Sequence, residues 1–467
     1  MTYLPLRAGP WRNELCLALA LLAYLAARLA PPMAGLSEAS QAAMGVAAAG
    51  MILWIFEAVP IGVTALIVIV LLALNPGMKL GGAVHGFTSE VVFFLIGVTA
   101  LGTAIEASGL AQRAARFLVR HAGGSPTRLY IQMIVALPAL AFLVPSAITR
   151  NAIMIPAYRE ALSGMGAGNS SRAGRALMLA LGMLNPLASS ALLTGGIASM
   201  AATTLLGGFT WLGWFSLMAV PYYALILLGG VYLRLMVGPF EAAVSVPMDA
   251  PPSTPLAAVE IKTLGVLALA SILWLTDSIH GLSPAIPALI AAAVLLCPRI
   301  GALSWKAFEA KLSWGLILTV GASMSLARSM TETGAAAWLG KLFVTHLASV
   351  AAAPAVVVVL LVIAVALVHL AITNLAACLA LLIPVAVTVA GAAGLNPLVC
   401  GLVVAVAVDA IILYPVQTAA NLLAYESGFF DARDVQRLGL GMLVLTVIVV
   451  LLMLPYWALL GLPLVPK

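Results

Sequence analysis

The polar residues that interrupt long apolar runs are the ones that could do chemistry in this chain. Arg150 follows Pro145-Ser146 inside an apolar stretch over 129–163. A charge at such a depth usually marks a transport path, although a snorkelling helix end is the alternative. Ser146 is predicted to begin the returning helix, whose free N–H groups and positive dipole end attract anions. Together these features predict a site for a carboxylate or a sulfate.

A second break occurs at the matching place later in the chain. Thr373 and Asn374 interrupt an apolar run over 351–390, where they could equally be ordinary helix caps. Two further spans are interrupted by polar or flexible residues. Amide and hydroxyl groups need hydrogen-bond partners inside a hydrocarbon layer, so this number of them is hard to explain by helix packing alone. The glycines of the first span could be packing residues only. The residues concerned are Ser189, Ser190, Thr194, Gly195 and Gly196 in the first span, and Pro415, Gln417, Thr418 and Asn421 in the second.

The elements that must position these residues are membrane helices. Of the 467 residues, 63% are hydrophobic and only 8% are charged, with a mean hydropathy of +1.15. Soluble domains carry about a quarter charged residues, so a water-soluble enzyme is excluded. Uncharged runs of 58 residues (176–233) and 67 residues (342–408) each exceed one span of about 20 residues. The runs do not alternate as strands of a membrane barrel would.

The order of apolar windows and breaks predicts an internal duplication. Gly97 to Val119 resembles Gly321 to Val344, and each half contains five crossings and one re-entrant hairpin, so the halves should have opposite orientations. We therefore expect an all-α polytopic membrane protein of about 11 transmembrane helices in two inverted repeats, each with a re-entrant hairpin and a broken helix. The expected boundaries are an extra N-terminal helix in 1–40, a first repeat over 41–238, a cytoplasmic linker over 239–262 and a second repeat over 263–467.

Charge gives an independent prediction of topology. With the N-terminus in the cytoplasm, sixteen of the 22 Lys and Arg residues fall on the cytoplasmic side, as the positive-inside rule requires. We therefore interpret the net charge of +6 as the excess of Lys and Arg that orients the chain in a cytoplasmic (inner) membrane. No nucleic-acid partner is expected. The four cysteines form no C-x-x-C pair and are expected to be small core residues.

Several spaced motifs resemble those of one known family. Residues 57–66 read E-A-V-P-I-G-V-T-A-L, residues 274–281 read W-L-T-D-S-I-H-G, and residues 417–421 read Q-T-A-A-N. In this order they resemble the divalent anion/sodium symporter family of dicarboxylate, tricarboxylate and sulfate carriers. The resemblance implies a homodimer that works by an elevator motion. Its transport domain would comprise about 129–206 and 351–430, and the remainder would be the scaffold.

The resemblance also implies which residues bind ligands. Hairpin tips in this family carry Ser-Asn-Thr motifs for anion and sodium. The substrate-binding candidates are Ser146, Ala147, Arg150, Thr194, Gly195, Thr373, Asn374, Gln417, Thr418 and Asn421, and the possible sodium ligands are Ser146, Asn151, Gly195, Thr373, Asn374 and Thr418. No other cofactor is expected.

The first tip departs from the family motif, because it reads Ser146-Ala147-Ile148 and keeps only the serine. A hard cation needs oxygen ligands, which Ala and Ile side chains lack, although backbone carbonyls would remain. Pro145-Ser146 followed by Arg150 instead resembles the family's dicarboxylate and citrate exchangers. A fixed guanidinium in place of sodium favours exchange or proton coupling.

The expected function is secondary active transport of small divalent organic or inorganic anions, by sodium symport or anion exchange. A cation/proton antiporter or an arsenite-type efflux permease of the same superfamily is the alternative, but the first tip has no carboxylate closer than Glu160 or Asp409. Asp409 itself is either a proton or cation site or a packing residue. An intramembrane enzyme is the least favoured alternative, since no histidine has metal-site spacing. Which anion moves, with which coupling and in which direction, does not follow from the sequence.

Overall fold

The computed structural model describes residues 11–31, 33, 35–56, 58–168, 171–241, 255–312, 314–338, 353–371 and 375–466. All regular secondary structure in these ranges is helical. The features singled out above that lie wholly or partly outside the described residues include Glu57, Thr373, Asn374, the end of the segment Gly321 to Val344, part of the predicted N-terminal helix in 1–40 and the larger part of the predicted linker over 239–262.

The helices of the first half begin with a helical pair and end with one long helix. They are α1 (Arg12–Leu29), α2 (Glu38–Phe56), α3 (Ile61–Ala73), α4 (Leu80–Ala83), η1 (His85–Thr88), α5 (Glu90–Ser108), α6 (Leu110–His121), α7 (Pro126–Leu143), α8 (Ala147–Gly164), α9 (Arg172–Met183), α10 (Asn185–Ser190), η2 (Leu193–Gly195), α11 (Ile197–Leu205) and α12 (Trp211–Val237).

The helices of the second half again end with one long helix. They are α13 (Ala258–Leu275), α14 (Asp277–His280), α15 (Ala285–Leu296), α16 (Trp305–Lys311), α17 (Trp314–Glu332), α19 (Pro354–Ala371), α20 (Leu375–Ala392), α21 (Pro397–Ala410), η3 (Pro415–Gln417), α22 (Ala419–Tyr425) and α23 (Ala432–Leu459).

Five of the described helices, α5, α7, α12, α13 and α23, are long and apolar enough to cross a membrane. The last helix shows why the chain needs a lipid environment. Leu440, Val444, Ile448 and Leu452 recur every four residues on α23 and are 45–62% exposed. Residues at this spacing share one helix face, so they form an apolar stripe that hydrocarbon accommodates and water does not. The prediction of a polytopic all-α membrane protein is confirmed.

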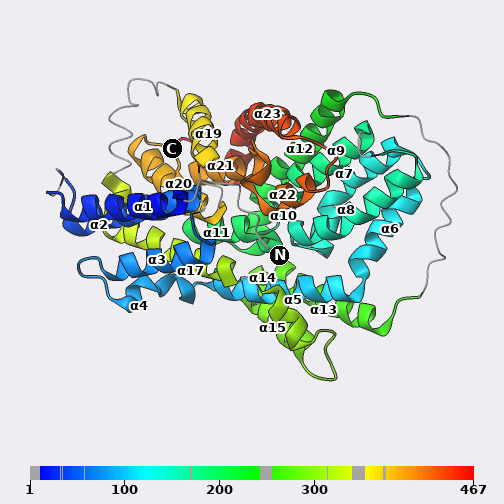
Figure 1. Ribbon diagram of the computed structural model, residues 1–467, viewed down its shortest axis with the longest axis horizontal. Coiled ribbons are helices and arrows are strands. Elements are labelled where there is room, and N and C mark those ends of the chain that lie inside the picture. Colours follow the sequence, from blue (N-terminus) through cyan, green and yellow to red (C-terminus); the bar gives the residue numbers. More distant parts are fainter. Residues whose placement is uncertain are drawn as a thin grey trace.

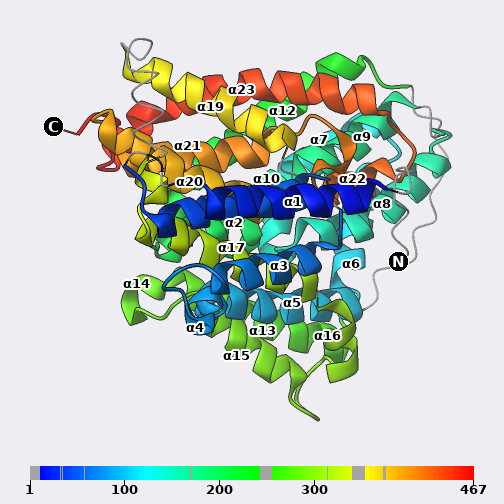
Figure 2. The ribbon, with the colours of Figure 1, turned by 60° about the vertical axis from the view of Figure 1, so that its left-hand side comes forward.

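The same order of elements occurs in both halves: a helical hairpin, an interrupted span and one long helix. In Figure 1 the hairpin α7/α8 lies at one end of the molecule and α19/α20 at the other, with α10, α11 and α22 between them. Segments of opposite halves are packed together there, because α22 contacts α8 and α9, while α11 contacts α20 and α21. Figure 2 shows α1, α12 and α23 running along nearly the same direction. The interrupted segments of the two halves therefore meet inside the fold.

Candidate substrate-binding site

The first hairpin turns at Pro145-Ser146 for local reasons. Proline disfavours a helical conformation in the residue before it, and Val144 has φ −129° and ψ 90°. Ser146 then caps α8, because its hydroxyl accepts the N–H of Thr149 at 3.3 Å. The predicted break, and a helix that returns from Ser146, are present in the structure. Ser146 and Ala147 are half-buried, while Ile148 beside them is exposed.

Arg150 lies one turn into α8 and is 2% exposed. Its guanidinium has five N–H donors, and all five are used within the protein. Nη1 donates to the carbonyls of Val144 and Pro145, at 2.5 and 3.0 Å. Nε donates to Asn185 Oδ1. Nη2 donates to the Asn185 carbonyl and to Ser189 Oγ, the latter at 2.7 Å. The guanidinium thus joins the hairpin turn to α10.

The charge of Arg150 has no carboxylate partner among the described residues. Ion pairs in the described part of the chain join Arg113 to Glu260, Arg175 to Asp434, Lys311 to Glu106 and Arg328 to Glu332. Every acceptor around the Arg150 guanidinium is a carbonyl, an amide or a hydroxyl. The first break therefore carries one buried positive charge whose hydrogen-bond partners are all neutral.

Asn151 and Asn185 connect this tip to both halves of the molecule. Asn151 Nδ2 donates to the carbonyls of Leu181 and Ala420, each at 2.9 Å. Asn185 Nδ2 in turn donates to Asn151 Oδ1 at 2.8 Å and to the Ala147 carbonyl at 3.1 Å. Asn185 and Ser189, which the sequence analysis did not assign to the binding site, thus hold the candidates Arg150 and Asn151 in place.

The first interrupted span is closely packed. A Cβ on Gly195 would lie 1.7 Å from the Ser189 carbonyl oxygen, so no side chain fits between the two backbones. Thr194 is buried, and its hydroxyl accepts the indole N–H of Trp211 at 3.1 Å. The backbone N–H of Trp211, at the start of α12, donates to the Asp277 carboxylate.

The second interrupted span has a different set of contacts. Gln417 is buried, its Oε1 accepts the N–H of Leu413 at 2.7 Å, and its Nε2 donates to the His369 carbonyl at 3.1 Å. Thr418 caps α22 by accepting the N–H of Asn421. Asn421 Nδ2 donates to the Tyr414 carbonyl, but the buried Asn421 Oδ1 has no partner among the described residues.

His369, four residues before Thr373, was not among the predicted site residues. Its side chain is 0% exposed and lies near the backbone of Ile411, but neither ring nitrogen makes a hydrogen bond of good geometry within the described ranges. No local pattern marks this histidine, except that it is a polar residue within an apolar run close to a predicted break. Thr373 and Asn374 themselves remain predictions, because they lie outside the described residues.

Within the described residues, the side-chain oxygens proposed as sodium ligands are already engaged. Ser146 Oγ, Asn151 Oδ1 and Thr418 Oγ1 each accept an N–H group of the protein. The carbonyls of Val144 and Pro145, which could also coordinate a hard cation, accept the Arg150 guanidinium. At the first tip the positive group held by these oxygens is therefore the arginine itself.

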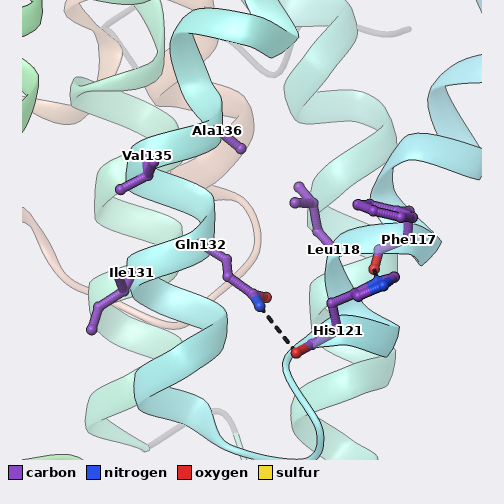
Figure 3. A pocket seen from close by; sticks show the side chains of 7 residues that line it. All are labelled: Phe117, Leu118, His121, Ile131, Gln132, Val135 and Ala136. Carbon is purple, nitrogen blue, oxygen red and sulfur yellow. Dashed lines mark hydrogen bonds between the residues drawn. The ribbon is translucent and has the colours of Figure 1, made fainter.

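A hollow of about 420 Å³ lies away from these breaks, between α6 and α7. Figure 3 shows Phe117, Leu118 and His121 on one side facing Ile131 and Gln132 on the other, with the Gln132 amide donating to the His121 carbonyl at 3.0 Å. Its lining is largely apolar and holds no arginine or lysine. This hollow lacks the charge that would hold a divalent anion.

The chain is similar to known membrane proteins over nearly its whole length. The chain matches the family model described as the sodium:sulfate symporter transmembrane region over residues 12–463. It is 27% identical to the L-tartrate/succinate antiporter of Escherichia coli, over 94% of this chain and 96% of that protein. It is also 26% identical to a membrane protein of Cupriavidus necator, over 95% of this chain and 92% of the relative.

Solved structures support the fold alone. The Alcanivorax borkumensis YdaH transporter is similar with a TM-score of 0.55 and 16% sequence identity, over 82% of this chain and 88% of that one. Neisseria gonorrhoeae MtrF is similar with a TM-score of 0.50 and 15% identity.

Both the matched family and the tartrate/succinate relative are transporters, which excludes the intramembrane enzyme. The resemblance seen in the motifs is confirmed, and the chain belongs to the sodium:sulfate symporter family of membrane transporters.

Proposed function

We propose that this protein exchanges small divalent anions across the cytoplasmic (inner) membrane, with dicarboxylates of the size of tartrate and succinate as the first candidates. The observation that carries the proposal is the buried charge of Arg150, which has only neutral partners. A buried charge without a counterion is costly, and a bound anion offsets that cost. The tartrate/succinate antiporter of Escherichia coli supports the choice of substrate.

The anion would be held at the start of α8 rather than by the guanidinium directly, because all five Arg150 donors are already used. A helix start offers N–H groups and a positive dipole end, and Ser146 adds a half-buried hydroxyl. Arg150 then contributes long-range attraction in a medium of low dielectric constant. Thr194, Gln417, Thr418 and Asn421 shape the two interrupted spans, and Thr373 and Asn374 stay proposed ligands at the second tip.

Exchange is favoured over sodium symport by the contacts at the first tip. A sodium ion would need oxygens that here accept N–H groups of Arg150, Thr149 and Asn185. A guanidinium cannot leave with the substrate, so its charge stays in the carrier and takes the place of a co-transported cation. The proposal includes the elevator motion, the homodimer and the cytoplasmic N-terminus expected from the sequence.

Transport in proteoliposomes tests the proposal. Purified protein should take up labelled succinate or tartrate only when unlabelled dicarboxylate is present inside, and replacing sodium with choline should leave the rate unchanged. Liposomes without protein, and proteoliposomes loaded with chloride instead of dicarboxylate, are the controls. Uptake that needs a sodium gradient and no internal anion would show symport and overturn the exchange proposal.

A further inference from the structure

A second buried ionisable group lies on α21, which packs against α10, the helix that Arg150 contacts. Asp409, in α21, is 6% exposed, and its Oδ2 accepts the hydroxyl of Tyr222 at 2.6 Å. The Ser190 side chain lies within hydrogen-bonding reach of the same carboxylate. Ser190 follows Ser189, whose hydroxyl contacts Arg150. Adjacent serines at the end of α10 thus contact the buried cation and the buried anion.

The carboxylate of Asp409 has little to stabilise its charge. No ion pair in the described ranges includes it. It lies in the last turn of α21, which ends at Ala410, and the C-terminal end of a helix carries negative partial charge. An ionisable side chain that is buried in a membrane helix without a cationic partner usually belongs to a transport or proton path.

The titratable groups on the elements packed against α21 are few. Tyr222 on α12, Cys378 on α20 and His369 on α19 are buried, and α10 and α11 carry no ionisable side chain. The other ionisable side chains of α12 are Tyr223 next to Tyr222, and Tyr232 and Arg234 towards its C-terminal end, and α21 itself also carries Cys400. On α23 the groups are Arg433, Asp434 and Arg437 in the first two turns and Tyr456 near the end, and Asp434 pairs with Arg175. The protonation state of Asp409 therefore decides the local charge beside α10.

We infer that Asp409 is a proton-binding site linked to the anion site, so that the carrier takes up a proton at Asp409 when a divalent anion binds. With Asp409 charged, the two buried charges of Arg150 and Asp409 sum to zero. With Asp409 protonated, the positive charge of Arg150 is left for the anion. The linkage is reciprocal: a proton on Asp409 strengthens anion binding, and a bound anion favours protonation of Asp409. This inference rests on the proposed function.

Anion binding to the purified full-length protein, measured by calorimetry in buffers of different ionisation enthalpy, tests the inference. Tartrate is the probe because it stays a dianion from mildly acidic to mildly alkaline pH. Wild-type protein should take up protons as tartrate binds, and its affinity should weaken by up to about tenfold per pH unit as the pH rises above the range where Asp409 is protonated. Asp409→Asn keeps an acceptor for Tyr222, and it should bind tartrate with an affinity that does not change with pH and without proton uptake.

Two further variants keep the test decisive if Asp409→Asn does not fold. Tyr222→Phe removes a donor that stabilises the charged carboxylate, so proton uptake should persist and the loss of affinity should move to higher pH. Asp434→Asn, which alters a carboxylate paired with Arg175, should behave as wild type. Wild-type binding of tartrate without pH dependence or proton uptake overturns the inference alone. Failure of wild-type protein to bind any divalent anion overturns the proposed function as well.

Discussion

The two breaks in this transporter differ in how completely their polar groups are paired. At the first break every N–H of Arg150 has an acceptor, and Asn151 and Asn185 are bonded to each other and to backbone carbonyls. At the second break the ring of His369 and the Oδ1 of Asn421 are buried with no partner in the described part of the chain. The first break holds a fixed charge in a rigid frame, whereas the second offers unpaired atoms.

This difference assigns separate roles to the two halves. A fully paired network is costly to disturb and keeps its geometry, so the first break suits the task of holding charge in one place. Unpaired buried polar atoms are costly unless a ligand, water or ion completes them. We therefore expect the first break to determine stability and anion attraction, and the second to recognise the anion.

Replacing the buried guanidinium should give the largest effect. Arg150→Met removes the donors of five acceptors, and each buried acceptor left without a partner costs about 1–3 kcal/mol. We expect a loss of folded protein, measured by size-exclusion chromatography in detergent and by thermal unfolding. Arg150→Lys keeps the charge but not the planar fork, so it should be intermediate in stability. A folded Arg150→Met variant with wild-type thermal stability would show that the network is unimportant.

The next largest effect should come from the close approach within the first interrupted span. In Gly195→Ala the new methyl would lie 1.7 Å from the Ser189 carbonyl oxygen, a backbone atom that cannot move without displacing α10. We expect a destabilisation of about 1–3 kcal/mol, typical of overpacking, and weaker anion binding. The neighbouring Gly196→Ala is the control, since its added Cβ meets nothing within 4 Å and its φ of 178° is extended. Equal thermal stability of the two variants would contradict this account of the span.

A smaller effect on stability, with a distinct effect on transport, is expected at the second break. His369→Leu removes two buried nitrogens that have no partner among the described residues, so stability should be unchanged or higher by about 1 kcal/mol. If the imidazole binds the anion, dicarboxylate exchange should fall about tenfold, the loss of about 1.4 kcal/mol expected for a hydrogen bond to a charged group. Tyr158→Phe removes another buried unpaired polar atom, on α8, and should leave exchange unchanged. Wild-type exchange by His369→Leu would assign the ring to packing.

The sequence located the breaks because local chemistry causes them. Pro145 keeps Val144 out of the helical conformation at the end of α7, and Pro415 begins η3 after α21 has ended at Ala410. The hydroxyls of Ser146 and Thr418 cap the helices that follow. Such signals act over a few residues. The side-chain partners of Arg150, which are Asn185 and Ser189, lie 35 and 39 residues further along the chain. Their contacts with Arg150 depend on how α10 packs on α8. The guanidinium was therefore found as a charge at the break, but its internal bonding was not.

The same reasoning explains which residues were missed. Asn185 and Ser189 lie in a span that was recognised as interrupted, but nothing local distinguishes a residue that binds substrate from one that orients Arg150. His369 has no neighbouring polar residue in its apolar run, and its burial without partners follows from the packing of α19 on α21. The division into transport domain and scaffold, and the two inverted repeats with their boundaries, remain predictions.

The smallest expected effect separates capping from anion binding at the first tip. Ser146 and Ser125 each accept the N–H three residues further on at 3.3 Å, one at the start of α8 and the other at the start of α7. Either change to alanine should therefore cost about 1 kcal/mol of stability through the lost cap. Only Ser146→Ala should also weaken tartrate binding. We expect a loss of about fivefold, for one hydrogen bond of order 1 kcal/mol between the half-buried Ser146 hydroxyl and the anion. Binding is measured by calorimetry, so the comparison does not depend on the change in stability.

Identical affinities in the two variants would limit Ser146 to its role as a cap. Direct contacts with the anion would then belong to the backbone of α8 and to the unpaired groups of the second break.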